Sequence, residues 1–290
     1  MSDPRRTKKD REKGQVRHTG GSHNAMESIS LKTYAPVGHC IYCGCTTNLE
    51  REHIIPFGLD GTAVLPKSTC RTCAKLTGRQ EEIVLRGPMW AIRVYRELRS
   101  RTKHRDAPKT YPLTVIRQEA EEVLDLPAQE YPILLHFPTF AAPAFLRPEG
   151  YKSGIRLSGI NTIAFGPPPE EVARRLGATS ISLTQEYEPV AFARVVAKIA
   201  HATAAAEGLL KLVEGNPYIV QSILGSVDDI GRWVGTIDGP VEAFAGQLHR
   251  ILFHRNDEQG LLLGEVQLFS YSQAPRYGVI LGKLAPVSPS

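Results

Sequence analysis

Cysteine is missing from most of this chain of 290 residues: all five cysteines lie between positions 40 and 73. A disulfide framework spreads its cysteines through a short secreted chain, so this distribution argues against one. The chain also lacks any apolar run near the ~20 residues that span a membrane. Its basic, polar N-terminus lacks the apolar stretch of a secretory signal. These absences predict a cytoplasmic protein without a membrane partner.

The later part of the chain also lacks recognisable chemical motifs. After residue 110 the sequence contains no glycine-rich phosphate loop, no nucleophile elbow and no metal-ligand spacing. Internal repeats and low-complexity tracts are absent as well. Target recognition, dimerisation and partner binding all stay open for this part, and the oligomeric state is not defined.

Hydrophobic patterning predicts the α+β class, with a small N-terminal unit followed by a larger domain. The predicted segments are a disordered basic tail (1–33), a cysteine-rich unit (34–83), a basic helix and linker (84–109, helical over 84–105) and an α+β domain (110–290). Strands are expected at 131–137, 153–165, 180–188, 261–271 and 277–284, and helices at 167–177 and 192–208. Residues 272–276 have the composition of a hairpin turn, and Pro108 and Pro112 indicate a loop.

The cysteines form two Cys-x-x-Cys pairs, Cys40 with Cys43 and Cys70 with Cys73. Two such pairs can place four thiolates tetrahedrally around Zn²⁺ at about 2.3 Å. Four protein ligands leave no open position on the ion, so the predicted zinc is structural. Cys45 is a fifth thiol without a matching partner in the sequence.

Between the two pairs lie Glu52-His53-Ile54-Ile55-Pro56 and a glycine-flanked turn at 58–61. Together with the second cysteine pair at the start of a helix, residues 38–82 resemble the HNH (His-Asn-His) endonucleases, in particular a four-cysteine subgroup of bacteria and phages. The resemblance implies a ββα-metal fold and hydrolysis of DNA phosphodiester bonds. It implies that His53 is the general base and that Glu52 is a ligand of a catalytic Mg²⁺ or Mn²⁺ ion.

Two positions depart from the family pattern. The middle Asn is not visible in 64–68, and the position after the last cysteine is Ala74, which cannot bind a metal. On a helix that starts near Cys70, Thr77 and Glu81 share a face with Ala74. Glu81 is therefore a candidate catalytic residue and replacement ligand for the divalent ion, or alternatively a solvated side chain. Without it, the chain would be a catalytically inactive, zinc-stapled nucleic-acid-binding protein, or an interaction module that keeps zinc for stability.

Basic residues cluster on both sides of the cysteine-rich unit. Residues 5–17 contain seven Lys and Arg against two acids, and residues 86–109 contain eight against two. Such runs attract phosphate backbones through counterion release, and the ordinary alternative is a solvated face. The predicted nucleic-acid contacts are Arg86, Arg93, Arg96, Arg99, Arg101 and Lys103. Trp90 and Tyr95 stack on bases or pack internally, whereas His39, His201, His249 and His254 are interpreted as structural or solvated.

Overall fold

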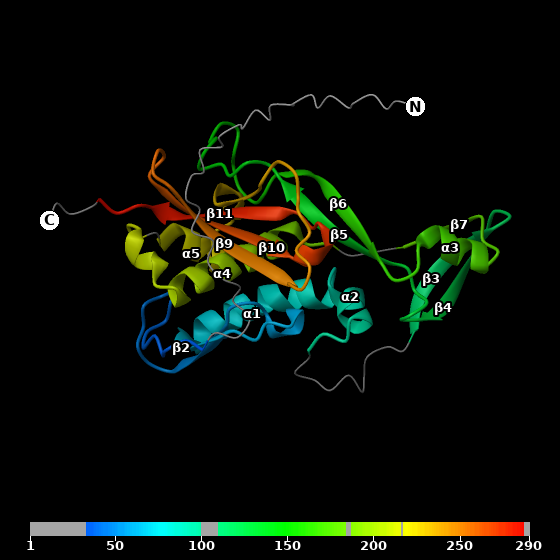
Figure 1. Ribbon diagram of the computed structural model, residues 1–290, viewed down its shortest axis with the longest axis horizontal. Coiled ribbons are helices and arrows are strands. Elements are labelled where there is room, and N and C mark those ends of the chain that lie inside the picture. Colours follow the sequence, from blue (N-terminus) through cyan, green and yellow to red (C-terminus); the bar gives the residue numbers. More distant parts are fainter. Residues whose placement is uncertain (1–32, 100–109, 184–186, 216, 287–290) are drawn as a thin grey trace, which may run out of the picture.

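The computed structural model describes residues 33–99, 110–183, 187–215 and 217–286 (Figure 1). The predicted tail, apart from its last residue, lies outside these ranges, as do Arg101 and Lys103. None of the helices in the described ranges is both long and apolar enough to cross a bilayer. The mixture of helices and antiparallel strands confirms the α+β class.

The N-terminal unit has the order strand, strand, helix. Strands β1 (Leu49–His53) and β2 (Val64–Cys70) pair antiparallel, and α1 (Arg71–Arg86) follows β2 without a break. The predicted single helix over 84–105 is wrong. Helix α1 ends at Arg86, and a short α2 (Trp90–Tyr95) begins after Gly87 and Pro88. Proline disfavours the helical conformation of the residue before it, which explains the break.

A four-stranded antiparallel sheet forms the other side of the main body, in the order β8-β11-β10-β9. Its strands are β8 (Val234–Thr236), β9 (His249–Asn256), β10 (Leu261–Leu268) and β11 (Arg276–Lys283). The predicted hairpin between the last two strands is confirmed. The predicted helix at 192–208 is α4 (Pro189–Ala206), and α5 (Pro217–Leu224) follows it. A Cβ at Gly264 of β10 would lie 2.9 Å from the Cβ of Ala200, so the sheet approaches α4 closely.

Helix α4 is the centre of the main body. Most of its side chains are buried, because the sheet covers one side of the helix and α1 packs against another (Figure 1). A helix that is apolar nearly all round requires such cover on several sides. The buried apolar side chains of 34–98 and those of 133–281 consequently form one continuous cluster. The cysteine-rich unit and the later residues share a core.

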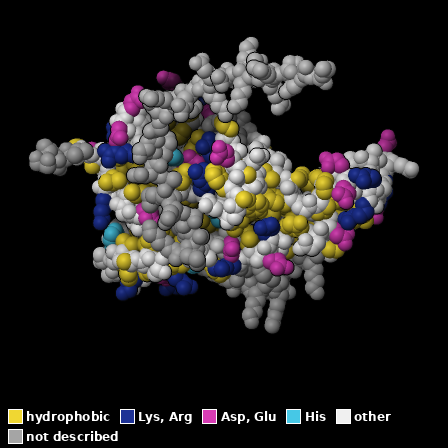
Figure 2. Space-filling view, viewed as in Figure 1, with side chains coloured by type: hydrophobic (Ala, Val, Ile, Leu, Met, Phe, Trp, Pro, Cys, Tyr) yellow, Lys and Arg dark blue, Asp and Glu magenta, His cyan; other side chains and the backbone are white. Residues whose placement is uncertain are grey.

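A hairpin and a small lobe complete the fold. Strands β5 (Ile133–Phe140) and β6 (Leu157–Phe165) pair with each other, and Phe140 N–H donates to Thr236 Oγ1 at 2.7 Å. The small lobe contains β3 (Thr110–Arg117), β4 (Ala120–Pro127), β7 (Ser180–Ser182) and α3 (Pro169–Arg175) around its own apolar cluster. Figure 2 shows hydrophobic side chains gathered along the band where this lobe joins the main body.

The loop predicted at Pro112 is also wrong, because Pro112 pairs with Asp125 inside β3. Strand β3 lies between β4 and β7, but β7 pairs only with Thr114, Val115 and Ile116. Within the described residues no further pairing of β3 with β7 is present, and a proline, which has no N–H group, is tolerated at a position that donates no ladder hydrogen bond.

Candidate functional site: a cysteine cluster beside a basic cleft

Each cysteine pair is held by local backbone geometry. In the first pair, Gly44 N–H donates to Cys40 O at 2.8 Å, and the Cys40 N–H donates to Cys45 O at 2.7 Å. This tight turn requires a φ of 76° at Gly44, a conformation that glycine adopts without strain. In the second pair, Cys70 caps the N-terminus of α1, and Cys73 N–H points at the Cys70 Sγ atom at 3.5 Å. The positive end of the helix dipole therefore faces the sulfurs.

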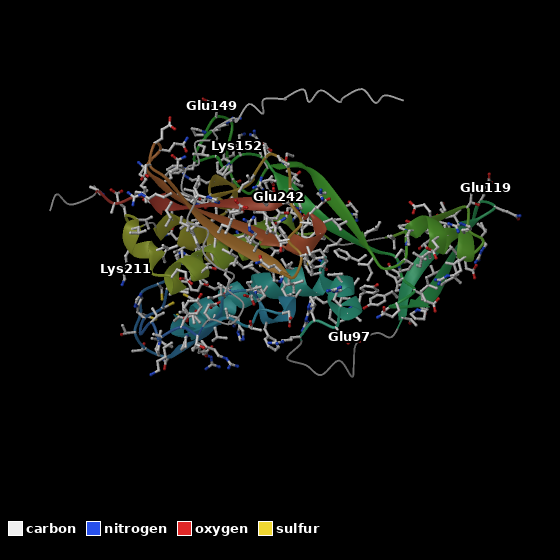
Figure 3. The ribbon with its side chains drawn as sticks, in the orientation of Figure 1. Glu97, Glu119, Glu149, Lys152, Lys211 and Glu242 are labelled. Carbon is white, nitrogen blue, oxygen red and sulfur yellow. The ribbon has the colours of Figure 1, made fainter. Side chains whose placement is uncertain are left out.

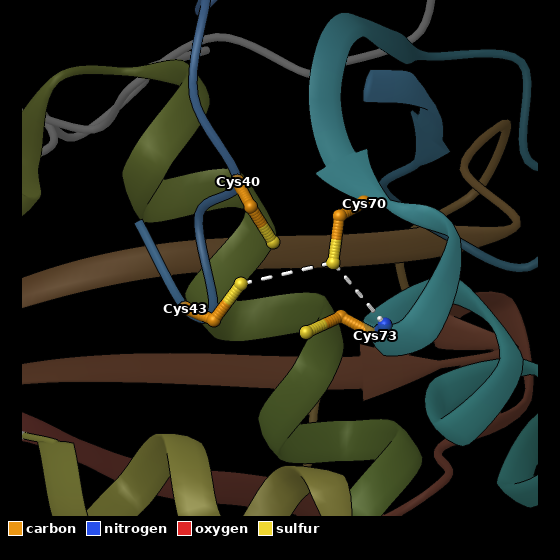
Figure 4. A group of neighbouring side chains, drawn as sticks. All are labelled: Cys40, Cys43, Cys70 and Cys73. Carbon is orange, nitrogen blue, oxygen red and sulfur yellow. Dashed lines mark hydrogen bonds between the residues drawn. The ribbon is translucent and has the colours of Figure 1, made fainter. Parts of the chain in front are cut away.

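The four sulfurs converge on one point (Figure 4). All four Sγ atoms lie within 4.8 Å of one another, and those of Cys43 and Cys70 are 3.7 Å apart. Tetrahedral Zn–S bonds of about 2.3 Å place sulfurs roughly 3.8 Å apart, so the cluster has dimensions suitable for zinc. The Cys73 backbone N–H lowers the pKa of Cys70 to about 6, which favours the thiolate that a metal binds. The predicted convergence of the two pairs is confirmed, and the cluster can hold a metal ion.

Backbone carbonyls of β2 brace the first cysteine turn. The pairing of β1 with β2 is irregular between Glu50 and Glu52, where β2 bulges. Carbonyls of the bulge accept hydrogen bonds of 2.8–3.0 Å from the chain that leads into the turn: Pro66 O from Val37, Lys67 O from Gly38 and Ser68 O from Ile41. Residues 64–68 contain no Asn that could brace the first cysteine turn, and main-chain hydrogen bonds from this segment hold the turn instead.

A cleft of about 600 Å³ lies beside the cysteine cluster, between the end of β1 and the exposed face of α1. Helix α1 contributes two small residues to its lining, Ala74 and Gly78, and both are half-buried. Thr77 also lines the cleft, but its hydroxyl donates to the carbonyls of Cys73 and Ala74 at 3.2 and 3.3 Å. Small side chains on this helix face therefore leave room next to β1.

The cleft brings together the three residues proposed for catalysis. His53 is the last residue of β1, so the strand ends at the point that a joint action of Glu52 and His53 requires. His53 is half-buried, and its ring lies edge-on to Phe57 at 5.5 Å between centroids. Glu52 is 5% exposed, and Glu81 reaches the same cleft from α1.

A lysine joins the two carboxylates. The Nζ atom of Lys198, on α4, lies 2.6 Å from Glu52 Oε1 and 2.9 Å from Glu81 Oε1. Burial lowers the pKa of Lys198, but the two carboxylates outweigh it and raise the pKa above its ordinary value. The side chain of Lys198 is 2% exposed, so a fully buried ammonium ion neutralises part of the acidic pair.

The predicted phosphate-contacting arginines have different environments. Arg93 is 7% exposed, and its guanidinium donates to Gly58 O at 2.7 Å and to Leu85 O at 2.9 Å. Arg99 pairs with Asp60 at 2.9 Å, and Arg96 lies over the ring of Tyr271. Arg86 lines the cleft and is exposed, although it pairs with Glu82 at 2.8 Å. Arg86 and Arg93 both line the cleft, but the buried Arg93 guanidinium is bonded to backbone carbonyls and stabilises the fold, whereas Arg86 is exposed.

Three basic residues that the sequence analysis did not single out also line the cleft: Arg51, Arg71 and Lys75. All three are exposed. Lys152 and Lys211, labelled in Figure 3, are also exposed but do not line the cleft. Because Arg51, Arg71 and Lys75 share one cleft with Arg86, they are the candidates for phosphate contacts there.

The other candidate residues have structural or exposed positions. His201 is buried and donates from Nε2 to Ile41 O at 2.9 Å, and His249 bonds Leu59 O at 2.7 Å. His254 contacts Glu265, and His39 is exposed. Trp90 and Tyr95 are half-buried. The positions of the four histidines agree with the prediction that they are structural or solvated.

Lys198 is the residue of this site that the sequence analysis missed. Its signal is a single lysine within the run VVAKIAHATAAA, whose other residues are almost all apolar or small. A charge in a helix that is buried on every side needs a partner. That argument predicts an acidic partner but does not say which one, because Lys198 is 145 positions from His53.

Comparison with family models, with curated proteins and with solved structures gave no match for this chain. The likeness to HNH endonucleases therefore depends on the motif residues between 38 and 82 alone.

Proposed function

We propose that this chain is an HNH-type endonuclease that hydrolyses phosphodiester bonds of nucleic acid, in the first instance DNA. The supporting observation is the cleft itself, where a β-β-α unit fastened by four converging cysteines brings His53, Glu52 and Glu81 together. The zinc at the cysteines has a structural role, because four thiolates leave it no open position.

In this proposal the cations of the cleft bind the substrate, and His53 activates water. Arg51, Arg71, Lys75 and Arg86 supply positive charge that balances the anionic phosphate. A histidine has an ordinary pKa near neutrality, so the His53 imidazole can take a proton from the attacking water. The water oxygen bonds to phosphorus as the bond between phosphorus and the 3′ oxygen breaks, and that oxygen leaves as a hydroxyl group after taking a proton from solvent.

A catalytic Mg²⁺ or Mn²⁺ ion between Glu52 and Glu81 does not fit the residues present. Magnesium requires oxygens at about 2.1 Å in an octahedral arrangement. The Lys198 ammonium already lies between these two carboxylates, at 2.6 and 2.9 Å. The proposed chemistry therefore includes no step through a divalent ion.

Two observations favour a second candidate, a zinc-stapled nucleic-acid-binding protein without catalysis. Ala74 removes the usual helix ligand, and Lys198 stands at the acidic pair. This protein would bind nucleic acid in the same cleft, through the same four cations, without hydrolysing it.

Replacing His53 with alanine is expected to decrease DNA cleavage by about 10²–10⁴-fold, the usual contribution of a general base. Nicking of supercoiled plasmid by the zinc-loaded protein measures it, with and without added Mg²⁺ or Mn²⁺. Zinc content should not change, because His53 is not among the four converging ligands.

His39→Ala is the matched control, because His39 is exposed and adjacent to the first cysteine. It should cleave at the rate of the unmodified chain. Unmodified protein that binds plasmid but nicks it under none of these conditions would establish the second candidate instead.

Neutralising three cations of the cleft together is expected to weaken nucleic-acid binding for all sequences. The triple variant carries Arg51→Gln, Arg71→Gln and Lys75→Gln. Each lost phosphate contact means that fewer counterions are released on binding, so the negative slope of log affinity against log salt should become shallower by about 3. Fluorescence anisotropy of a labelled duplex over a range of salt concentrations measures it. The control neutralises Arg147, Lys152 and Lys211, which are exposed and do not line the cleft. Equal slopes in the two triple variants would refute the assignment of the binding surface.

A further inference from the structure

Four oxygens surround the Nζ atom of Lys198. Two belong to the carboxylates of Glu52 and Glu81, at 2.6 and 2.9 Å. The other two are backbone carbonyls at the end of β1: His53 O, which accepts a short hydrogen bond, and Ile54 O at 3.3 Å. We call these four oxygens the cation cage.

The donor set of the cage is the kind that hard cations prefer. Carboxylate and carbonyl oxygens are the usual ligands of Ca²⁺ and Mg²⁺ in proteins. The cation that the structure places among them is the Lys198 ammonium, and its contacts with the two carboxylates, at 2.6 and 2.9 Å, are close to the roughly 2.7–2.9 Å of charge-assisted hydrogen bonds. The cage is thus built for a cation, and the chain supplies that cation from α4.

We infer that Lys198 is the resident cation behind the cleft: its ammonium fills the cation cage, closes it to divalent ions and fixes the end of β1 that carries His53. Lys198 is a positioning residue, because its buried side chain contacts the Glu52 carboxylate and the His53 carbonyl rather than the open cleft. The inference rests on the geometry of the cage and holds whether or not the protein cleaves nucleic acid.

Burial explains why the lysine and a metal ion exclude each other. The side chains of Lys198 and Glu52 are 2% and 6% exposed, so the cage has little room for an additional hydrated ion. Tyr42 adds no negative charge to the cage, because its buried hydroxyl stays neutral: burial, then Glu52 and Glu81, raise its pKa well above the ordinary value. Removing the ammonium while keeping most of the lysine stem should therefore open a site with two uncompensated carboxylates.

The test measures Mn²⁺ binding to zinc-loaded, full-length protein by electron paramagnetic resonance, because bound Mn²⁺ loses the signal of the free ion. The variants are Lys198→Met, which keeps an unbranched stem without the ammonium, and Lys198→Met combined with Glu52→Gln and Glu81→Gln. The wild type is expected to bind no Mn²⁺ in the cage. Lys198→Met is expected to bind one ion per chain and to melt at a higher temperature when Mn²⁺ is added. The triple variant is expected to fold and to bind none.

Three results would overturn the inference. One is wild-type binding of a Mn²⁺ ion that Glu81→Gln abolishes, because the ammonium would not then close the cage. Another is a folded Lys198→Met chain that binds no Mn²⁺. The third is a Lys198→Met chain that stays unfolded with Mn²⁺ while the triple variant folds. None of these readouts depends on cleavage of nucleic acid. A protein that does not cleave DNA can therefore be distinguished from one whose Lys198 does not exclude divalent ions from the cation cage.

Discussion

Replacing Lys198 with methionine is expected to lower the free energy of unfolding by about 3–5 kcal/mol, the usual cost of removing one partner from a buried ion pair. The ammonium is 2% exposed and has two carboxylate partners. Without it, the two carboxylates stay in a poorly solvated position and repel each other. Urea denaturation of the zinc-loaded protein, without divalent ions other than zinc, measures the loss.

A surface lysine provides the comparison. Lys211 is exposed on the surface of the main body (Figure 3), and Lys211→Met should change stability by no more than about 0.5 kcal/mol. Lys198 also connects α4 to β1 and α1. Its loss should therefore increase amide hydrogen exchange in the β1–β2 pair before it does so in the four-stranded sheet. A loss below about 1 kcal/mol would contradict the interpretation of Lys198 as the counter-charge of the acidic pair.

Much of the candidate site could be predicted from sequence because its parts are local. The two cysteine pairs, the acid-histidine pair and the helix after Cys70 all lie within residues 40–86, where spacing alone restricts the geometry. Glu81 was placed correctly on the face of α1 that looks into the cleft, since positions four apart on a helix are neighbours. Its partner could not be predicted, because Lys198 reaches the cleft only through the packing of α4 against α1.

The division of the chain into units shows a similar limit. A change in composition near residue 110 favoured a separate later domain, yet the buried side chains on the two sides of that point form one cluster. The reason is α4, which is apolar nearly all round and is covered by the cysteine-rich unit as well as by the sheet. Strands β3 and β4 were missed for a local reason. Proline in β3 and several acids in β4 conceal the alternation that identifies a strand.

Loss of zinc is expected to have the second large effect. Replacing Cys73 with serine should remove the metal ion and destabilise the cysteine-rich unit, because apparent zinc-binding energies in small four-ligand sites are about 10–16 kcal/mol. Besides the metal, the first cysteine turn is held by backbone bonds to the β2 bulge and by the hydrogen bond of His201 to Ile41 O. Elemental analysis should find one zinc per chain in the unmodified protein and a large loss in the variant. Hydrogen exchange should increase in β1, β2 and the first turn of α1.

Cys45→Ser is the matched control for the zinc prediction. Cys45 lies in the same turn, but its sulfur is not one of the four that converge, and it contacts Thr47 O at 3.9 Å. Its replacement should leave the zinc content and the exchange rates unchanged. Because α1 and the cysteine-rich unit cover α4, the Cys73→Ser variant should also expose apolar surface of α4 and bind a hydrophobic dye. Two results would show that the cysteine cluster does not hold the cysteine-rich unit together. One is a Cys73→Ser chain that keeps its zinc, and the other is a chain that loses zinc without faster amide hydrogen exchange in β1 and β2.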